Sequence, residues 1–341
     1  FKQKTAYEIS LGLVGSEMCI RDRLSFIACN DGIQLEPETY RNPIISGFAP
    51  DPSICRSGDD FYLINSTFEY FPGIPVYHSR DLVSWKLIGN ALHSVNQNVA
   101  MDFINSSAGI HAPTIRYHKG LFYIITTNNL NGKMINFIIT AEDPSGPWSE
   151  AYFLKDAPGI DPSLFFDDNG KVWYTGSHVP PDPEFDGQAE IWMQELDLNQ
   201  MQLVGEKYYL TRGFSGGTWA EGPHIYKHEN YYYLMISEGG TLHNHAVTIS
   251  ASKTITGPYI ANARNPILTH RHLSLNHPII AVGHGDLVQT KNNDWYMVAL
   301  GFRPIDNKYK NLGRETFLIP VVWETEPYWW KDEKVSWPVC S

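Results

Sequence analysis

The stretch Ala49-Pro50-Asp51-Pro52-Ser53-Ile54 indicates the fold, because its pattern recurs along the chain. Each copy is a triplet similar to Pro-Ser-Ile, followed after a short turn by an aromatic pair. The five copies are Pro52-Ser53-Ile54 with Phe61-Tyr62, Pro113-Thr114-Ile115 with Phe122-Tyr123, Pro162-Ser163-Leu164 with Trp173-Tyr174, Pro223-His224-Ile225 with Tyr232-Tyr233, and the degenerate Gly285-Asp286-Leu287 with Trp295-Tyr296. The steps between triplets are 61, 49, 61 and 62 residues. Five units at this period predict a radial array of small sheets, none of which can bury both of its faces alone.

Each unit contains segments typical of four strands. The triplet is followed by a hairpin turn such as Ser57-Gly58-Asp59-Asp60, then by the aromatic strand and a third apolar strand. A polar turn and an aromatic residue close the unit, as in Asp81-Leu82-Val83-Ser84-Trp85. No segment shows sustained helical periodicity. We therefore expect an all-β fold, a five-bladed β-propeller with four-stranded antiparallel blades, and rim loops at the inserts 179–188 and 268–280.

Composition favours one packed domain that does not bind nucleic acid. The chain has 341 residues, of which 43% are hydrophobic and 18% charged, so a large core is available. The five units make residues 42–341 a single propeller domain. The net charge is −11 and no run of Lys and Arg occurs, which argues against a phosphate-binding surface and fits a neutral substrate. The 10 Trp and 19 Tyr residues are packing residues in most repeat proteins, but carbohydrate sites also use such rings as stacking platforms.

Residues 1–41 lie outside the repeats. Residues 1–23 show no strand alternation and resemble a translated sequencing adapter, so we exclude them from the fold; a short native helix is the alternative. The next segment, Leu24-Ser25-Phe26-Ile27-Ala28-Cys29-Asn30-Asp31, resembles the end of a bacterial lipoprotein signal peptide, in which Cys29 would carry the lipid. An arbitrary apolar stretch is the alternative. Residues 31–41 are polar and are expected to form a linker.

A lipid anchor at Cys29 would make the protein a secreted, periplasmic or surface lipoprotein of a bacterium. No run of about 20 apolar residues occurs, so no membrane-spanning helix is expected. The four cysteines, Cys19, Cys29, Cys55 and Cys340, show neither metal-ligand spacing nor a dense framework, so we expect no structural disulfides.

One repeat position carries ionisable residues in all five units. In a propeller the first strand of each blade lines the central axis, so residues at the start of these strands converge on one mouth of the channel. The residues at this position are Asp51, His111, Asp161, Glu221 and His284. A purely structural role would favour small or apolar residues, because burying uncompensated charge is costly; turn capping is the alternative for Asp51 and Asp161. Three crowded carboxylates push their pKa values apart, which supplies the acid and the base that glycoside hydrolysis needs.

Three motifs carry a specific resemblance. Gly47-Phe48-Ala49-Pro50-Asp51-Pro52-Ser53, Gly159-Ile160-Asp161-Pro162-Ser163 and Trp219-Ala220-Glu221-Gly222-Pro223-His224 resemble the three signature motifs of glycoside hydrolase family 43. The motifs occur in the family's order, each at a repeat start, and the resemblance extends over residues 42–320. It implies a five-bladed propeller of the kind found in β-xylosidases and α-L-arabinofuranosidases.

The resemblance implies a role for each carboxylate. Asp51 matches the general base that activates water, and Glu221 matches the general acid that protonates the leaving oxygen. Asp161 matches the residue that tunes the pKa of the acid and helps to orient it. Because the family inverts anomeric configuration, we expect the Asp51 and Glu221 carboxyl groups to lie about 6.5–9.5 Å apart, whereas about 5 Å would indicate a retaining enzyme.

Four further residues match family positions. Arg303 matches an arginine that reaches the sugar, with a surface ion pair as the alternative; Phe68 matches an aromatic wall of the same subsite, with core packing as the alternative. His111 occupies a substrate-binding position where many relatives carry Trp. His284 matches an axial histidine that in some relatives binds a calcium ion or a water cluster. No cofactor is expected to be required, and calcium near His284 and a hydrogen-bonded histidine without metal both remain open.

The resemblance ends after Gly313-Arg314-Glu315-Thr316-Phe317-Leu318 and Val321-Val322-Trp323-Glu324. In many relatives a β-sandwich domain follows and lends an aromatic residue to the site. Residues 328–341 depart from the expected pattern, so we expect a fragment or a single-domain member that lacks the sandwich.

The resemblance implies an inverting glycoside hydrolase that releases xylose or arabinose from xylan or arabinoxylan, polysaccharides or their oligosaccharides. Xylan 1,4-β-xylosidase is the first hypothesis and α-L-arabinofuranosidase the alternative, since the motifs do not separate the two. A non-catalytic carbohydrate-binding propeller is the alternative from another class. It would require a lost acid or base, and both Asp51 and Glu221 are present.

Overall fold

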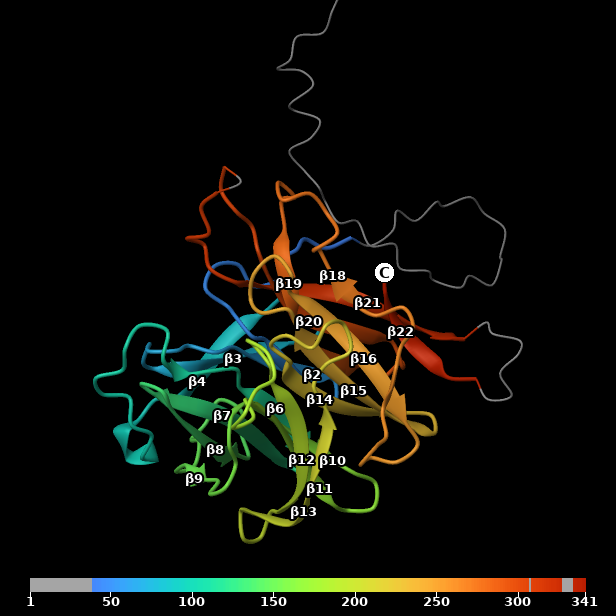
Figure 1. Cartoon of the computed structure of the whole chain (residues 1–341). Helices are drawn as coiled ribbons and strands as arrows, with labels where there is room; N and C mark the ends of the chain where they lie inside the picture. Colours follow the sequence, from blue (N-terminus) through green and yellow to red (C-terminus); the bar gives the residue numbers. More distant parts are fainter. Residues whose placement is uncertain (1–38, 307, 327–333) are drawn as a thin grey trace, which may run out of the picture.

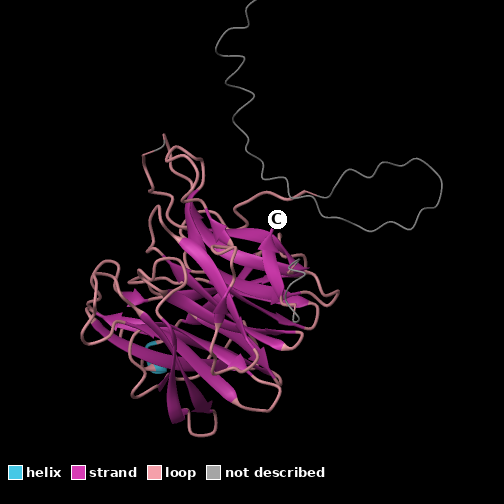
Figure 2. Cartoon of the chain, turned by 45° about the vertical axis from the view of Figure 1, so that its right-hand side comes forward, coloured by secondary structure: helices cyan, strands magenta, loops and turns pink. Residues whose placement is uncertain are grey.

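Strands make up nearly all of the regular structure (Figure 2). The computed structural model describes residues 39–306, 308–326 and 334–341. Within these residues it has 22 strands and one three-residue 3₁₀ turn, η1 (Val95–Gln97). The strands form five antiparallel sheets around a common axis (Figure 1). The predicted all-β, five-bladed propeller is therefore confirmed.

The blades follow one another in chain order. Blade one contains β1 (Ser53–Ser57), β2 (Asp60–Ile64), β3 (Gly73–Ser79) and β4 (Lys86–Leu92). Blade two contains β5 (Gly109–Ile110), β6 (Thr114–His118), β7 (Leu121–Leu130), β8 (Lys133–Ala141) and β9 (Tyr152–Phe153). Blade three contains β10 (Ile160–Phe166), β11 (Val172–His178), β12 (Glu190–Asp197) and β13 (Gln202–Thr211). Blade four contains β14 (Glu221–His228), β15 (Tyr231–Glu238), β16 (Ala246–Ser252), β17 (Ile260–Ala261) and β18 (Leu268–Thr269). Blade five contains β19 (Ile280–Gln289), β20 (Trp295–Phe302), β21 (Glu315–Thr325) and β22 (Ser336–Cys340).

Two blades carry a fifth, short strand. In blade two, β5 and β6 both pair with β7, because Pro113, which has no N–H to donate, lies in the break between them. In blade four, β18 comes from the insert 268–280 and pairs with β16. The other insert, 179–188, is a loop between β11 and β12, as expected.

The innermost strand of each blade contains residues of its triplet: β1 and β6 begin inside the triplet, and β10, β14 and β19 begin two to five residues before it. These strands contact one another in a closed ring: β1 lies against β6, β6 against β10, β10 against β14, β14 against β19, and β19 against β1. Each inner strand has one edge free of pairing, so proline is tolerated near its start. The ring brings the starts of the five inner strands to the same mouth of the channel.

The hydrophobic core is divided among the five interfaces between blades. Five clusters of buried side chains each combine residues from two neighbouring blades. The cluster between blades one and five, for example, contains Leu63 and Val298, and that between blades three and four contains Ile191 and Leu234. The apolar faces of each sheet are therefore buried by its neighbours, as the repeat period predicts.

The first described residues close the ring against the last blade. Ile44 N–H donates to the Thr316 carbonyl at 2.9 Å, and Thr316 N–H donates to the Ile45 carbonyl at 3.0 Å. The Asn42 side chain donates to the Leu318 carbonyl and accepts from its N–H, at 2.8 and 2.9 Å. Figure 1 shows this blue segment beside the red β21. Residues 42–45 thus bind β21 of blade five.

A buried carboxylate on β19, Asp286, links four blades at the axis. It accepts from Ser53 Oγ of blade one at 2.6 Å and from Tyr226 OH of blade four at 2.7 Å. Both terminal nitrogens of Arg116, in blade two, bind it at 2.8 and 3.0 Å. Asp286 is fully buried, and the neighbouring cation and donors outweigh its burial, so its pKa is lowered.

Residues 1–38, including Cys19 and the proposed lipid anchor Cys29, are not among the described residues, whereas Cys55 and Cys340 are free thiols. Over residues 39–306, 308–326 and 334–341, no helix has the length and apolarity needed to cross a bilayer.

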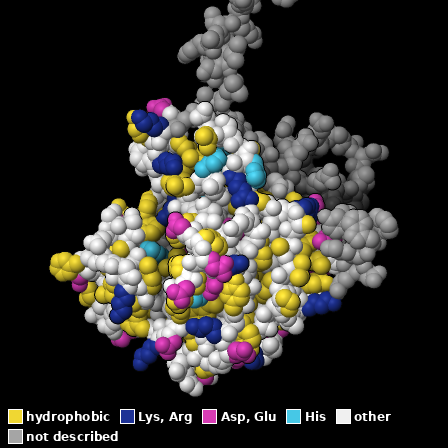
Figure 3. Space-filling model, viewed as in Figure 1, with side chains coloured by type: hydrophobic (Ala, Val, Ile, Leu, Met, Phe, Trp, Pro, Cys, Tyr) yellow, Lys and Arg dark blue, Asp and Glu magenta, His cyan; other side chains and the backbone are white. Residues whose placement is uncertain are grey.

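On the face shown in Figure 3, Lys and Arg side chains are scattered among acidic and apolar ones and do not gather into one basic patch.

Candidate active site

The five ionisable residues of the repeat position lie at or near the starts of the inner strands. Asp51 precedes β1, His111 precedes β6, Asp161 and His284 lie in β10 and β19, and Glu221 is the first residue of β14. The β10, β14 and β19 ladders change register at these positions, which marks local bulges. Asp51, Asp161 and His284 have φ values of 50°, 54° and 48°. Such bulges and left-handed residues redirect side chains, and here they accompany residues that lie at the channel mouth.

Asp51 is buried and strongly paired. Its Oδ1 lies 2.8 Å from Arg314 Nη1, and its Oδ2 accepts from Ser66 Oγ at 2.5 Å. His284 Nδ1 lies 4.0 Å from Oδ1. Burial opposes the charged form of Asp51, but its cationic and hydroxyl neighbours outweigh burial, Arg314 most of all, so the pKa of Asp51 lies below its ordinary value. Asp51 is therefore an ionised carboxylate at neutral pH.

Glu221 has the opposite electrostatic environment. Its side chain is 16% exposed, and Oε1 has no hydrogen-bond partner within the described residues. Burial raises the pKa of Glu221 well above its ordinary value, and repulsion from Asp161 and Asp51 adds to the shift. The arrangement favours a protonated Glu221 close to an ionised Asp51.

A buried histidine, His245, faces Glu221. His245 Nε2 lies 3.7 Å from Glu221 Oε1, and Nδ1 lies 3.2 Å from the Ala281 carbonyl, to which it donates when it carries the proton. Burial lowers the pKa of His245 to about 3, so its imidazole is neutral at physiological pH. Glu221 therefore faces a neutral ring, and His245 adds no positive charge that would favour the ionised form of Glu221.

Asp161 lies close enough to both other carboxylates to repel their charges. Its Oδ2 accepts from the N–H of Gly222, the residue after Glu221, at 3.1 Å. Burial is the main reason that the pKa of Asp161 is raised; Asp51 adds to the shift and His284 opposes it. Asp161 thus holds the backbone that carries Glu221 and contributes negative charge beside it.

His284 packs under this group, and the residues around it do not fit a calcium ion. A Cβ at Gly222 would lie 3.1 Å from the His284 ring, and the His284 N–H donates to Ser237 Oγ at 2.8 Å. Calcium requires six or more oxygen ligands, whereas the Asp51 carboxylate, 4.0 Å from His284, is already paired with Arg314. Across the described ranges, no three His, Cys, Asp or Glu side chains are grouped to hold a metal.

Three predicted substrate-binding residues have different surroundings. Phe68 is half-buried beside the site: its ring lies 5.2 Å from Arg314 Cζ and 5.5 Å from the His111 ring. Arg303, in contrast, pairs with the buried Glu315 at 2.6 and 2.8 Å. Phe68 and His111 therefore lie with the carboxylate group, and Arg303 is held by a residue next to Arg314.

The repeat pattern did not reveal two residues of the site, Arg314 and His245. Each immediately precedes the third strand of its blade, β21 for Arg314 and β16 for His245. The first and third strands of an antiparallel blade run in the same direction, so their starts lie at the same end. A comparison of the residues that precede third strands is the signal that would have found both.

The comparison with protein families agrees with this geometry. A family model described as glycosyl hydrolases family 43 matches residues 40–327. The chain belongs to glycosyl hydrolase family 43. The family model covers all three carboxylates.

Individual proteins are similar to this chain over most of the chain's length. A xylosidase/arabinosidase of Butyrivibrio fibrisolvens is 52% identical over 304 residues, 88% of this chain and 56% of that protein. A non-reducing end α-L-arabinofuranosidase of Bacteroides ovatus is 46% identical over 295 residues, 86% of this chain and 54% of that protein. The structure of a xylan β-1,4-xylosidase from Bacillus halodurans C-125 has a TM-score of 0.79 and 38% identity, covering 88% of this chain and 56% of that one. The chain thus spans about half the length of the curated relatives it matches.

Proposed function

We propose that this chain is an inverting glycoside hydrolase that releases xylose or arabinose from xylan-derived substrates, with xylan 1,4-β-xylosidase as the favoured activity. One observation carries the proposal. Two carboxyl groups share one channel mouth, and their surroundings move their pKa values in opposite directions, down for Asp51 and up for Glu221. A base and an acid that coexist at one pH are what an inverting mechanism needs.

Asp51 acts as the general base in this mechanism. Its ionised carboxylate accepts a proton from a water molecule while the water oxygen attacks the anomeric carbon. Arg314 and Ser66 already bind the two oxygens of Asp51, which fixes the orientation of the carboxylate. A general base contributes only when it is ionised. Because its pKa is lowered, Asp51 stays ionised, and can accept a proton, at pH values below the ordinary pKa of a carboxyl group.

Glu221 acts as the general acid. It donates its proton to the glycosidic oxygen as the bond to the anomeric carbon breaks, and it becomes a carboxylate. The Glu221 proton returns from solvent, and the proton on Asp51 is lost to solvent, before the next turnover. Asp161 positions this acid through the Gly222 N–H and keeps the pKa of Glu221 raised by its charge.

Phe68, His111 and Arg314 form the wall of the sugar site in this proposal. The Phe68 ring supplies an apolar face beside Asp51, and Arg314 keeps donors other than the Nη1 that binds Asp51. Arg303 contributes by holding Glu315, next to Arg314, through two hydrogen bonds. No step of the mechanism requires a metal.

α-L-Arabinofuranosidase is the second candidate. The relative that is 46% identical bears that name, whereas the similar solved structure is named a xylan β-1,4-xylosidase. Xylose and arabinofuranose present similar hydroxyl groups, so the carboxylate geometry serves both.

Hydrolysis of aryl β-D-xylosides and aryl α-L-arabinofuranosides by the wild type, Glu221→Ala and Asp51→Ala tests the proposal. The ratio of the two wild-type rates separates the candidate activities. Glu221→Ala should lose most activity on poor leaving groups and less on good ones, because only poor leaving groups need protonation. Asp51→Ala should lose activity on both, by about 10²-fold or more, since water is no longer activated.

Tyr152→Ala serves as the control, because Tyr152 lies in the outer strand β9 and its side chain is 45% exposed. Rates in both carboxylate variants equal to that of the wild type would contradict the assignment. A wild type that binds oligosaccharide but hydrolyses none would favour the non-catalytic carbohydrate-binding propeller.

A further inference from the structure

An exposed indole, Trp219, lies two residues before Glu221. Its side chain is 45% exposed, although an aromatic ring of this size is usually buried in a propeller core. Its neighbour along the chain, Ala220, is completely buried, so the segment is anchored while the indole points outwards. The packing of the blades does not account for this ring.

The backbone of Trp219 is held in an unfavourable conformation. Its φ is 52°, in the left-handed region that a bulky residue rarely adopts. Two hydrogen bonds impose it: Trp219 N–H donates to the Gly187 carbonyl at 2.6 Å, and Gly239 N–H donates to the Thr218 carbonyl at 2.7 Å. Strain of this kind is a pointer to function when the surrounding structure maintains it.

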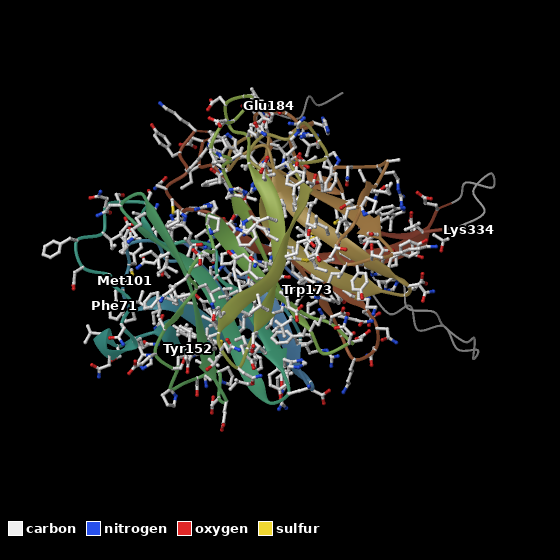
Figure 4. The ribbon with its side chains drawn as sticks, turned by 60° about the horizontal axis from the view of Figure 1, so that its bottom comes forward. Phe71, Met101, Tyr152, Trp173, Glu184 and Lys334 are labelled. Carbon is white, nitrogen blue, oxygen red and sulfur yellow. The ribbon has the colours of Figure 1, made fainter. Side chains whose placement is uncertain are left out.

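Two glycines leave room for the indole. A Cβ at Gly187 would lie 2.8 Å from the Trp219 ring, and a Cβ at Gly240 would lie 3.1 Å from it. Gly187 is the last residue but one of the insert 179–188, which Arg212 holds through an ion pair of 2.9 Å with Glu184. Figure 4 shows Glu184 at the rim of the molecule. Two loops from different blades therefore fix the position of one exposed ring.

The ring forms one wall of a hollow that it shares with Glu221. The hollow has a volume of about 360 Å³, within the range of small-ligand sites. It is lined by Trp219, Glu221, Gly239, Gly240, Thr241 and Leu242. The lining combines one aromatic ring, one apolar side chain and a hydroxyl group with the proposed acid. This combination suits a sugar ring, which presents C–H groups on its faces and hydroxyl groups at its edge.

We propose that Trp219 is the stacking platform for the first sugar of the leaving group. The inference rests on the proposed role of Glu221: the oxygen that Glu221 protonates belongs to this sugar, so the sugar must lie beside Glu221, and the hollow is there. The C–H face of a pentose packs on the indole, and Thr241 Oγ1 is available to its hydroxyls. In a xylan-derived substrate this sugar is a xylose unit whether the enzyme releases xylose or arabinose.

The test compares two substrates that both need protonation by Glu221 and differ in the leaving group. Xylobiose leaves a xylose ring, whereas methyl β-D-xyloside leaves methanol; if the enzyme prefers arabinofuranosides, arabinofuranosyl-xylobiose and methyl α-L-arabinofuranoside replace them. In Trp219→Ala, the ratio of kcat/KM for the oligosaccharide to that for the methyl glycoside should fall about tenfold. Trp219→Phe, which keeps a smaller ring, should fall between Trp219→Ala and the wild type.

Tyr152→Ala is the matched control, because Tyr152 (labelled in Figure 4) is an aromatic residue of equal exposure in the outer strand of another blade, and it should leave the ratio unchanged. An unchanged ratio in both Trp219 variants overturns the inference, and so does an equal loss on both substrates, which would mean that Trp219 only supports Glu221. A wild type inactive on every substrate overturns the proposed function and this inference with it.

Binding provides a second measurement that does not depend on turnover. Glu221→Gln and the double variant Glu221→Gln with Trp219→Phe are titrated with xylobiose and with xylose by calorimetry. The double variant should bind xylobiose several-fold more weakly and xylose equally well. Equal affinities for xylobiose would contradict the stacking role, even if the Trp219→Ala variant failed to fold.

Discussion

At the scale of single residues, the same burial has different outcomes for two carboxyl groups. Burial raises the pKa of Asp51 and of Glu221, but a guanidinium 2.8 Å away reverses the effect for Asp51. Glu221 faces a neutral imidazole and two carboxylates, so its pKa stays raised. Burial shifts the pKa of both carboxyl groups in the same direction, so the position of Arg314 decides which of them is the base.

Replacing Arg314 by Gln should move both limbs of the pH profile of kcat/KM to higher pH. Arg314 lowers the pKa of Asp51 and also that of Glu221, so its removal raises both. Activity falls at low pH as Asp51 takes up a proton and at high pH as Glu221 loses one. Measurement of kcat/KM against pH for a good and a poor leaving group checks this expectation.

Arg264→Gln is the control for that experiment, because Arg264 forms an exposed ion pair with Glu324. Its profile should match that of the wild type. Limbs that stay in place in Arg314→Gln, with only the height of the profile reduced, would mean that Arg314 does not set these pKa values.

At the scale of elements, the sequence predicted the strands of the blades well, but it did not show that residues preceding the third strands belong to the site. The triplets lie within five residues of the starts of the inner strands, so the repeat pattern alone assigns Asp51, Asp161 and Glu221 to one mouth of the channel. The left-handed backbone at Asp161 left no trace in composition, because it accompanies a register shift between β10 and β11.

Arg314 and His245 could not be found from the same pattern, because they precede third strands, whose starts have no repeated motif. Asp286 was visible only as a departure from the triplet in the fifth unit. Its significance depends on contacts with β1, β6 and β14, which lie far away in sequence. Long-range pairing of this kind is determined by the closed ring and not by local propensity.

Asp286→Asn should destabilise the propeller by about 3 kcal/mol at neutral pH, because it leaves the buried Arg116 without its ionic partner. The lowered pKa of Asp286 means that its carboxylate contributes stability above the unfolded-state pKa of about 3.9 and loses it as the pH falls below that value. The difference between wild type and variant should therefore shrink on acidification. Denaturant unfolding at several pH values measures it.

Asp59→Asn is the matched control, since Asp59 is 64% exposed and pairs with Lys291 at the surface. Its effect should stay within about 0.5 kcal/mol. A similar small effect for Asp286→Asn, or a difference that persists unchanged at low pH, would contradict the axial role of the carboxylate.

At the scale of the whole molecule, one blade pattern is repeated five times as a scaffold. The residue that each blade places at the channel mouth, which we call its tip, differs between blades. The five interblade clusters hold the sheets at fixed positions around the axis. The stretch Ala49-Pro50-Asp51-Pro52-Ser53-Ile54 is one copy of the scaffold, and Asp51 is its tip. The tips Asp51, Asp161 and Glu221 all belong to the propeller, which therefore supplies the acid, the base and the residue that positions the acid in the proposed mechanism.

The stereochemistry of the reaction gives the sharpest test of the roles assigned to Asp51 and Glu221. Proton NMR should follow the first sugar released by the wild type from whichever aryl glycoside it hydrolyses faster, before the anomers equilibrate. We predict a first-formed sugar of inverted anomeric configuration, because Asp51 activates water and does not itself bond to the anomeric carbon. A first-formed sugar with retained configuration would contradict the assignment of Asp51 as a base and Glu221 as an acid.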